Sequence, residues 1–202
     1  MAASGNGADN MVARVTALRL VCLATPVQPA VRRGVVPTEG NGGGADDVPL
    51  PAWPCAPSVP IIAGTGWSAA IARRWCPDQR VTTIEALRGA GAGRWGGQAL
   101  SDLPPAEVGR WLADPDFAPP DGESRGCVLD RVRTWLATRD GPGAACVVVA
   151  EPVIVRALVL AVLGGGASME HALDVAPLSR TVLVRHRTWR VRQMGMPLTG
   201  GE

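Results

Sequence analysis

Thr25 and Glu151 each stand at the end of a run of apolar residues, where a buried strand would finish. A carboxylate can act as a general base, and a threonine hydroxyl becomes nucleophilic when a base activates it. Structural roles are open for both residues. Thr25 could bond the nearby backbone, and Glu151, which precedes Pro152, could stabilise a helix start through the macrodipole with a lowered pKa.

Three further charged residues could contact a ligand. Arg32 and Arg33 follow the first apolar run and could hold an anion, although surface arginines are commonly solvated. Glu123 lies in a turn before a helical pattern, so it could contact a ligand or cap that helix. His171 and His186 receive no catalytic role.

Apolar runs and helical periodicity predict strands that alternate with helices. Strands are predicted over 18–23, 59–63, 144–150, 181–184 and 188–192, and helices over 67–75, 123–138 and 152–163, with a further helix start near residue 101. This alternation predicts an α/β fold with a mostly parallel sheet.

The chain is predicted to form one domain over residues 14–202, preceded by a disordered tail over 1–13. A stretch rich in Gly, Pro and Asp over 38–57 predicts a long flexible loop, either a lid or a tolerated insertion. Unusually for a domain of this size, the chain contains no lysine. Heavy use of Ala, Gly, Pro and Arg suggests a GC-rich, actinobacterial coding sequence.

The net charge and the cysteines limit the classes of partner and cofactor that we expect for this chain. A net charge of +2, with dispersed arginines, predicts neither a nucleic-acid partner nor a membrane partner. Five widely spaced cysteines without Cys-x-x-Cys favour reduced thiols, and no metal site or cofactor is predicted. A signal-peptide pattern is missing and the longest apolar run, 153–163, is short for a bilayer, so a cytoplasmic location is expected.

Five stretches carry a family resemblance. The first runs from Arg19 to Gly34 (Arg-Leu-Val-Cys-Leu-Ala-Thr-Pro-Val-Gln-Pro-Ala-Val-Arg-Arg-Gly), and the others begin, in order, at Gly93, Trp111, Val147 and His186. Together they resemble the histidine phosphatase (phosphoglycerate mutase-like) superfamily over roughly residues 18–194. The resemblance implies a three-layer sandwich, with helices flanking the sheet and an anion pocket at the carboxyl end of its strands.

The same resemblance implies that the reactive residues of the family are missing. The positions of its histidines, its phosphate-binding arginines and its acid hold Ala24 and Thr25 (the first Arg-His pair), Glu151 (the second His), Trp67 or Ser68 (the second Arg) and Gly89 (the acid). A pocket that has lost cations and gained a carboxylate is expected to repel anions. A carboxylate about 4 Å from a phosphate oxygen repels it by roughly 4 kcal/mol at an effective dielectric constant of about 20.

The sequence therefore predicts a catalytically inactive pseudoenzyme that acts as a binding or regulatory partner. Its partner could be another protein, an active paralogue, a second copy in a homodimer, or a small molecule in the degenerate pocket. One alternative is a repurposed enzyme, possibly in a bacterial biosynthetic pathway, with Thr25 and Glu151 acting on a non-phosphorylated substrate. Another is a phosphate sensor using Arg32, Arg33 and the helix start at Pro152.

Overall fold

The computed structural model describes residues 17–38, 40, 43–55, 58–139 and 145–198. The predicted tail over 1–13 lies outside them. Within the described residues, no helix combines the length and the apolar character that crossing a membrane would require.

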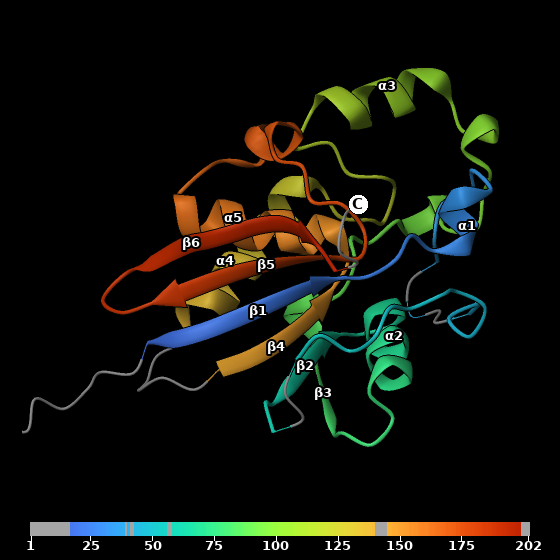
Figure 1. Ribbon diagram of the computed structural model, residues 1–202. Coiled ribbons are helices and arrows are strands. Elements are labelled where there is room, and N and C mark those ends of the chain that lie inside the picture. The colour runs from blue at the N-terminus through green and yellow to red at the C-terminus, as the bar shows by residue number, and fades with distance from the viewer. Residues whose placement is uncertain (1–16, 39, 41–42, 56–57, 140–144, 199–202) are drawn as a thin grey trace, which may run out of the picture.

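A six-stranded sheet in the order β3-β2-β4-β1-β5-β6 forms the centre of the molecule (Figure 1). Its strands are β1 (Leu18–Ala24), β2 (Ile61–Gly64), β3 (Val81–Ile84), β4 (Ala145–Ala150), β5 (Ser179–Arg185) and β6 (Trp189–Pro197). Neighbouring strands are parallel from β3 to β1, and β5 runs antiparallel to both β1 and β6. The predicted mostly parallel sheet is confirmed.

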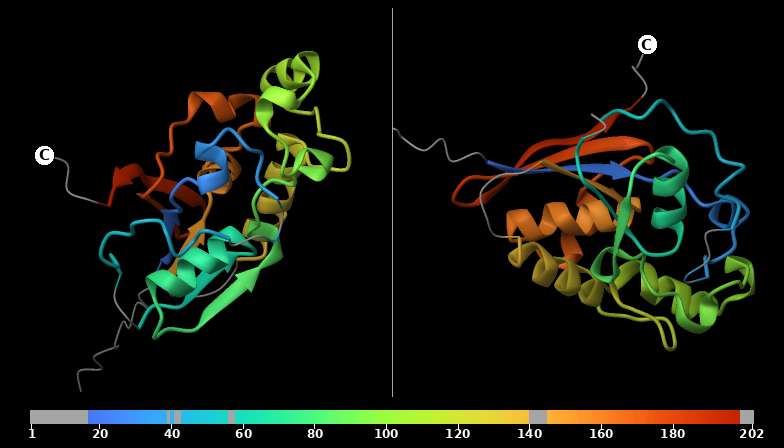
Figure 2. Two further views of the ribbon diagram at one scale, coloured as in Figure 1. Left: turned by 90° about the vertical axis from the view of Figure 1, so that its right-hand side faces the viewer. Right: turned by 90° about the horizontal axis from the view of Figure 1, so that it is seen from below.

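Helices cover both faces of this sheet. The α-helices are α1 (Pro29–Arg32), α2 (Trp67–Trp75), α3 (Pro105–Ala113), α4 (Arg125–Ala137) and α5 (Pro152–Leu163), and the 3₁₀ helices are η1 (Glu85–Leu87), η2 (Gly93–Trp95), η3 (Leu100–Asp102) and η4 (Ala167–Ala172). The α2 helix packs on one face, and α4 and α5 pack together on the other (Figure 2). The three-layer α/β sandwich is therefore confirmed.

Alternation along the strands divides the core into two clusters. In β4, Val148 and Ala150 face the α4–α5 layer, whereas Val147 and Val149 face α2, because successive side chains of a strand point to opposite faces. In β1, Cys22 is fully buried on the α4–α5 side, and this burial raises the pKa of its thiol. All five cysteines are free in the structure.

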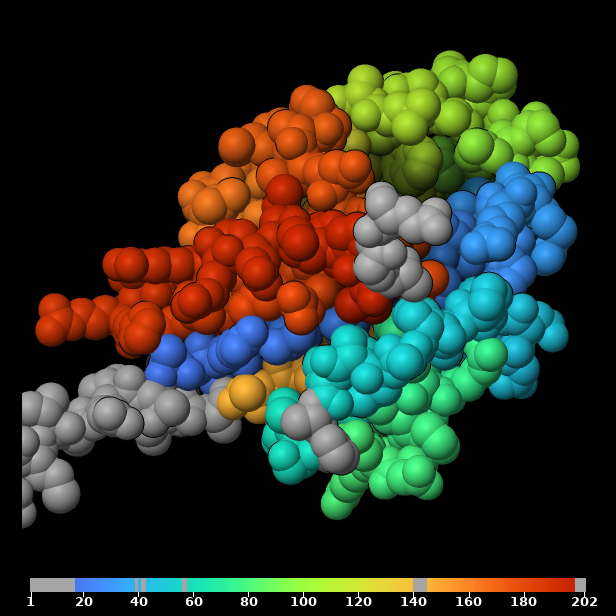
Figure 3. Space-filling model, viewed as in Figure 1, coloured from blue at the N-terminus to red at the C-terminus, as the bar shows by residue number. Residues whose placement is uncertain are grey.

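The described part of the Gly- and Pro-rich loop over 38–57 packs against α2. The Arg74 guanidinium donates hydrogen bonds to the carbonyl oxygens of Ala45 and Val48, whose side chains are buried. The indole N–H of Trp75 donates a hydrogen bond to the carbonyl oxygen of Pro51 in the loop, at 2.7 Å. In Figure 3 this cyan segment lies over the front of the α2 region. It covers the apolar face of α2 and so completes that layer.

Candidate functional site

A cavity of about 590 Å³ lies at the carboxyl edge of the sheet, where parallel α/β sheets bind ligands. Its walls come from the segments that follow β1, β2, β3 and β4, and from the segment that carries η2, η3 and α3. Among the lining residues are Gln28, Val31, Trp67, Glu85, Arg88, Gly89, Trp95, Leu100, Trp111, Glu123, Glu151 and Val153. Figure 3 shows the α1 segment (blue) and the α3 segment (green) at this same end of the molecule.

Glu151 lines the cavity directly after β4. Its Oε2 accepts a hydrogen bond from Nε2 of Gln28 at 3.1 Å. Its Oε1 lies so close to Gly89 that a Cβ on residue 89 would be only 2.2 Å away from it. Glycine at position 89 therefore leaves the space that the Glu151 carboxylate occupies.

Burial raises the pKa of Glu151, and the hydrogen bond from Gln28 and the charge of Arg131 offset this only in part. The expectation of a lowered pKa is wrong. Glu151 does stand at the N-cap of α5, but its side chain makes no capping hydrogen bond. The carboxylate loses hydration without gaining the amides of the first helical turn, so desolvation outweighs the macrodipole.

The raised pKa predicts how a Glu151→Gln variant depends on pH. A folded state that holds a proton more tightly than the unfolded chain is destabilised when that proton leaves. We expect Glu151→Gln to be more stable than the wild type at about pH 7 to 8. The gain should shrink as pH falls through the raised folded pKa and vanish below the unfolded value of about 4.3. Urea unfolding followed by tryptophan fluorescence across this range measures the difference.

The control for this prediction is Glu107→Gln, which removes one carboxylate from α3, outside the cavity. A gain at Glu151→Gln that stays constant with pH, or that matches the control at every pH, would contradict the burial of a carboxylate at position 151.

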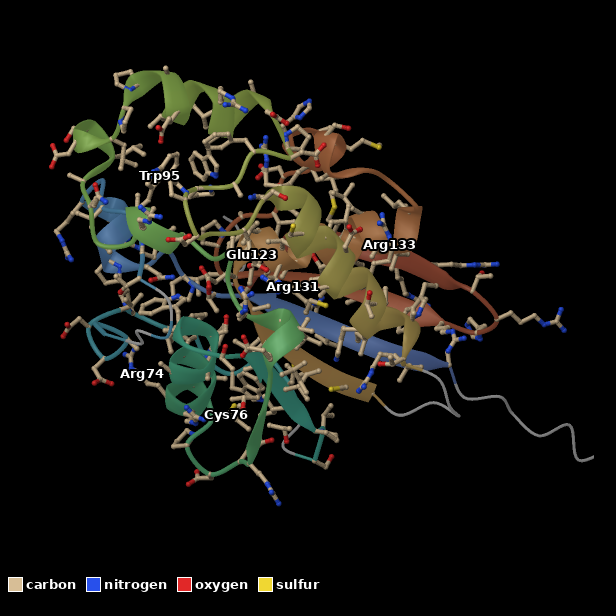
Figure 4. All side chains as sticks on the ribbon, turned by 180° about the vertical axis from the view of Figure 1, so that it is seen from behind. Arg74, Cys76, Trp95, Glu123, Arg131 and Arg133 are labelled. Carbon is tan, nitrogen blue, oxygen red and sulfur yellow. The ribbon has the colours of Figure 1, made fainter. Side chains whose placement is uncertain are left out.

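Glu123 also lines the cavity, but it is held by cations (Figure 4). It pairs with Arg88 at 2.5 Å and with Arg131 at 3.0 Å, and it accepts a hydrogen bond from the amide of Gly91 at 3.0 Å. Burial alone would raise the pKa of Glu123, but these hydrogen bonds outweigh it and lower the pKa. Ser124 caps α4, because its hydroxyl accepts a hydrogen bond from the backbone amide of Cys127 at 3.1 Å. Glu123 thus connects Arg88, Gly91 and Arg131 at the wall of the cavity.

Thr25, Arg32 and Arg33 lie outside the cavity. Thr25 is fully buried; its amide donates to the Ala150 carbonyl at 2.9 Å, yet its hydroxyl has no hydrogen-bond partner among the described residues. The predicted side-chain bond to the backbone is therefore not found there. Arg32 and Arg33 are exposed, and Arg33 borders a separate hollow of about 280 Å³. Of the five candidate residues, the structure brings Glu151 and Glu123 to the cavity.

Sequence reasoning missed Gln28, Arg88 and Arg131. Arg131 donates to the carbonyl oxygens of residues 86, 88 and 89 at 2.8, 3.0 and 2.9 Å, and so fixes the wall of the cavity from behind. Trp95 and Trp111 contact each other edge to face at 6.0 Å, and both also line the cavity. No spacing in the sequence connects these residues, because they come from separate segments.

The cavity has no histidine among its described lining residues. Neither of the two histidines of the chain, His171 and His186, lines it. Among the described residues, no group of His, Cys, Asp and Glu is arranged to hold a metal ion. The arrangement instead offers carboxylates within walls that are largely apolar.

Comparison with known proteins identifies the family. The family model for the histidine phosphatase superfamily (branch 1) matches residues 68–196, and the chain belongs to this superfamily, as the sequence resemblance predicted. No curated protein matches the chain.

Solved structures of low sequence identity share the fold. YhfR of Bacillus stearothermophilus has a TM-score of 0.75 at 16% identity, covering 89% of this chain and 97% of that one. The alpha-ribazole phosphatase from Shigella flexneri reaches 0.72 at 17% identity, with 92% and 100% covered. A mycobacterial glucosyl-3-phosphoglycerate phosphatase reaches 0.68 at 22% identity, with 89% and 99% covered. These likenesses establish the phosphoglycerate mutase-like architecture.

Proposed function

We propose that this chain is a catalytically inactive member of the superfamily, which acts as a binding or regulatory partner. The observation that carries the proposal is that the cavity at the carboxyl edge of the sheet is lined by no histidine. Phosphoryl transfer through a phosphohistidine needs an imidazole nucleophile at that place. The Thr25 hydroxyl cannot replace it, because Thr25 is fully buried and lies outside the cavity.

The charges of the cavity support the same proposal. Glu85, Glu123 and Glu151 line it, and Arg88 is the one cation among its described lining residues. Arg88 pairs with both Glu85, at 2.8 Å, and Glu123, at 2.5 Å. A phosphate group would therefore enter a cavity in which carboxylates outnumber cations, and it would be repelled. The partner is then another protein, such as an active paralogue or a second copy of this chain, or a ligand that is not an anion.

Phosphate release tests the proposal directly. We expect the purified protein to release no phosphate from p-nitrophenyl phosphate or 3-phosphoglycerate, even at high protein concentration. The mycobacterial glucosyl-3-phosphoglycerate phosphatase, assayed on its named substrate, serves as the positive control. Turnover that survives repurification and is lost in Glu151→Gln would overturn the proposal.

A repurposed enzyme is the second candidate, and the raised pKa of Glu151 inside the cavity favours it. A carboxyl group whose pKa is moved toward neutrality can act as a general acid or base on a non-phosphorylated substrate. Thr25 would take no part. This candidate predicts that Glu151→Gln abolishes an activity while the fold stays intact. A phosphate sensor using Arg32 and Arg33 draws no support from the cavity, since neither residue lines it.

A further inference from the structure

The cavity combines apolar walls with a carboxylate, Glu151, that forms no ion pair among the residues the structure describes. Trp67, Trp95 and Trp111 all line it. Trp67 and Trp95 are only 2% and 4% exposed, and the indole N–H of Trp67 is bound to the carbonyl oxygen of Pro26 at 3.0 Å, whereas Trp111 is partly exposed. Tryptophan side chains pack well against apolar groups, so these residues contribute to an apolar wall.

Glu151 differs from the other carboxylates of the cavity in its partners. Arg88 pairs with Glu85 and Glu123, and Arg131 pairs with Glu123. Among the described residues, Glu151 forms no ion pair; its Oε2 accepts from the neutral amide of Gln28, and its Oε1 accepts no hydrogen bond. The Glu151 side chain is partly exposed to solvent, and it lines the cavity. A carboxylate oxygen in such surroundings is stabilised by a donor, best of all a charged one.

We propose that the cavity binds an apolar primary amine, whose ammonium group donates a hydrogen bond to Oε1 of Glu151 and whose hydrocarbon or aromatic body lies against the apolar lining residues, Trp111, Val31 and Leu100 among them. This inference rests on the proposed function, because a cavity that served phosphate esters would select the opposite charge. The volume of about 590 Å³ is that of a small-molecule site.

Exposed apolar residues at the cavity fit a ligand with an apolar body. Val31 and Leu100 both line the cavity, and they are 47% and 42% exposed, so they stand at its mouth. An amine with a long apolar body would cover these side chains as its ammonium group reached Glu151. Covering them removes apolar surface from water, which adds to the affinity.

The charge of the ligand also predicts a pH signature. Burial raises the pKa of Glu151 in the free protein, and an ammonium beside the carboxylate would lower it again. At pH values near the raised pKa, binding of the amine therefore releases a proton from Glu151. Affinity should rise with pH through the raised pKa, until the amine itself loses its proton at higher pH.

Three probes of matched shape test the proposal by isothermal titration calorimetry: 4-phenylbutylamine, 4-phenylbutanol and 4-phenylbutyrate. We expect the amine to bind about tenfold more tightly than the alcohol, which is the effect of one charge-assisted hydrogen bond. The acid should bind more weakly than the alcohol. In Glu151→Gln the advantage of the amine over the alcohol should fall below about threefold, while the alcohol binds as before; Glu107→Gln, with the same loss of charge on α3, should behave like the wild type.

Each outcome decides the inference. Equal binding of amine and alcohol, no binding of the amine, or tightest binding of the acid overturns it; an advantage of the amine that survives in Glu151→Gln also overturns it, because the carboxylate would then not be the receptor. Failure here is distinguishable from failure of the proposed function, which depends on phosphate release alone. If the protein neither binds the amine nor releases phosphate, the amine-binding inference is overturned and the proposed function stands.

Discussion

Replacing Arg131 with methionine should lower the free energy of unfolding by about 3 kcal/mol, the lower end of the effect of removing one partner from a buried ion pair, because this pair is partly buried. The Arg131 side chain is only 17% exposed and binds both carboxylate oxygens of Glu123, at 3.0 and 3.2 Å. It also donates to three carbonyl oxygens of residues 86–89. Methionine keeps the apolar stem but has no donor, so Glu123 loses one of its two cations and the carbonyls lose their partner.

The matched control is Arg133→Met, on the same helix (Figure 4). Arg133 is 45% exposed; it pairs with the exposed Asp130 at 3.0 Å and donates to the Gly165 carbonyl at 2.9 Å. Solvent screens such a pair, so this variant should lose about 1 kcal/mol or less. Urea unfolding followed by circular dichroism gives both values. Equal losses in the two variants would show that the partly buried contacts of Arg131 do not hold the cavity wall.

Helices with clear local signals could be predicted from the sequence. The range predicted for α5, 152–163, coincides with the observed helix, because Pro152 suits the first helical turn and Gly164 adopts the left-handed conformation that ends it, with φ of 71°. The range predicted for α2 is also the observed one. In α5 the features that begin and end the helix lie within it or directly beside it.

Elements that depend on a neighbour were harder to predict. The β3 strand, Val81–Ile84, was missed because it is four residues long and no residue in it is fully buried, so it shows no apolar run. The β6 strand extends to Pro197, beyond the predicted end at 192, because pairing with β5 supplies its hydrogen bonds although most of its side chains are exposed. The α1 helix is a single turn without a buried residue.

The candidate site could be predicted in part. The end of β4 places Glu151 at the carboxyl edge of the sheet, as the strand pattern predicted. The surroundings of its carboxylate could not be predicted, since Gln28 lies 123 positions away and the space beside Oε1 depends on Gly89. Thr25 also follows a strand, but its hydroxyl is buried outside the cavity. Which way a side chain at a strand end points is decided by packing across the whole chain.

Gly64→Ala should destabilise the protein by about 3 kcal/mol, at the upper end of the usual cost of overpacking a core. A Cβ on residue 64 would lie 2.0 Å from the carbonyl oxygen of Leu87 and 2.6 Å from its carbonyl carbon. These are backbone atoms next to a fully buried side chain, so they cannot turn aside as a flexible side chain would. Gly64 ends β2, and its contact sets how closely η1 approaches the sheet.

The same substitution at Gly109 should act in the opposite direction. Gly109 lies inside α3 and a Cβ there would meet nothing within 4 Å, so Gly109→Ala should stabilise the protein by about 0.5–1 kcal/mol through helix propensity. Thermal and urea unfolding should show a lower free energy of unfolding than the wild type for Gly64→Ala and a higher one for Gly109→Ala. A loss below about 1 kcal/mol at Gly64→Ala would mean that the backbone at Leu87 can retreat. Because residues 88–92 follow Leu87 directly and line the cavity, the contact between Gly64 and Leu87 also helps to place this part of the cavity wall.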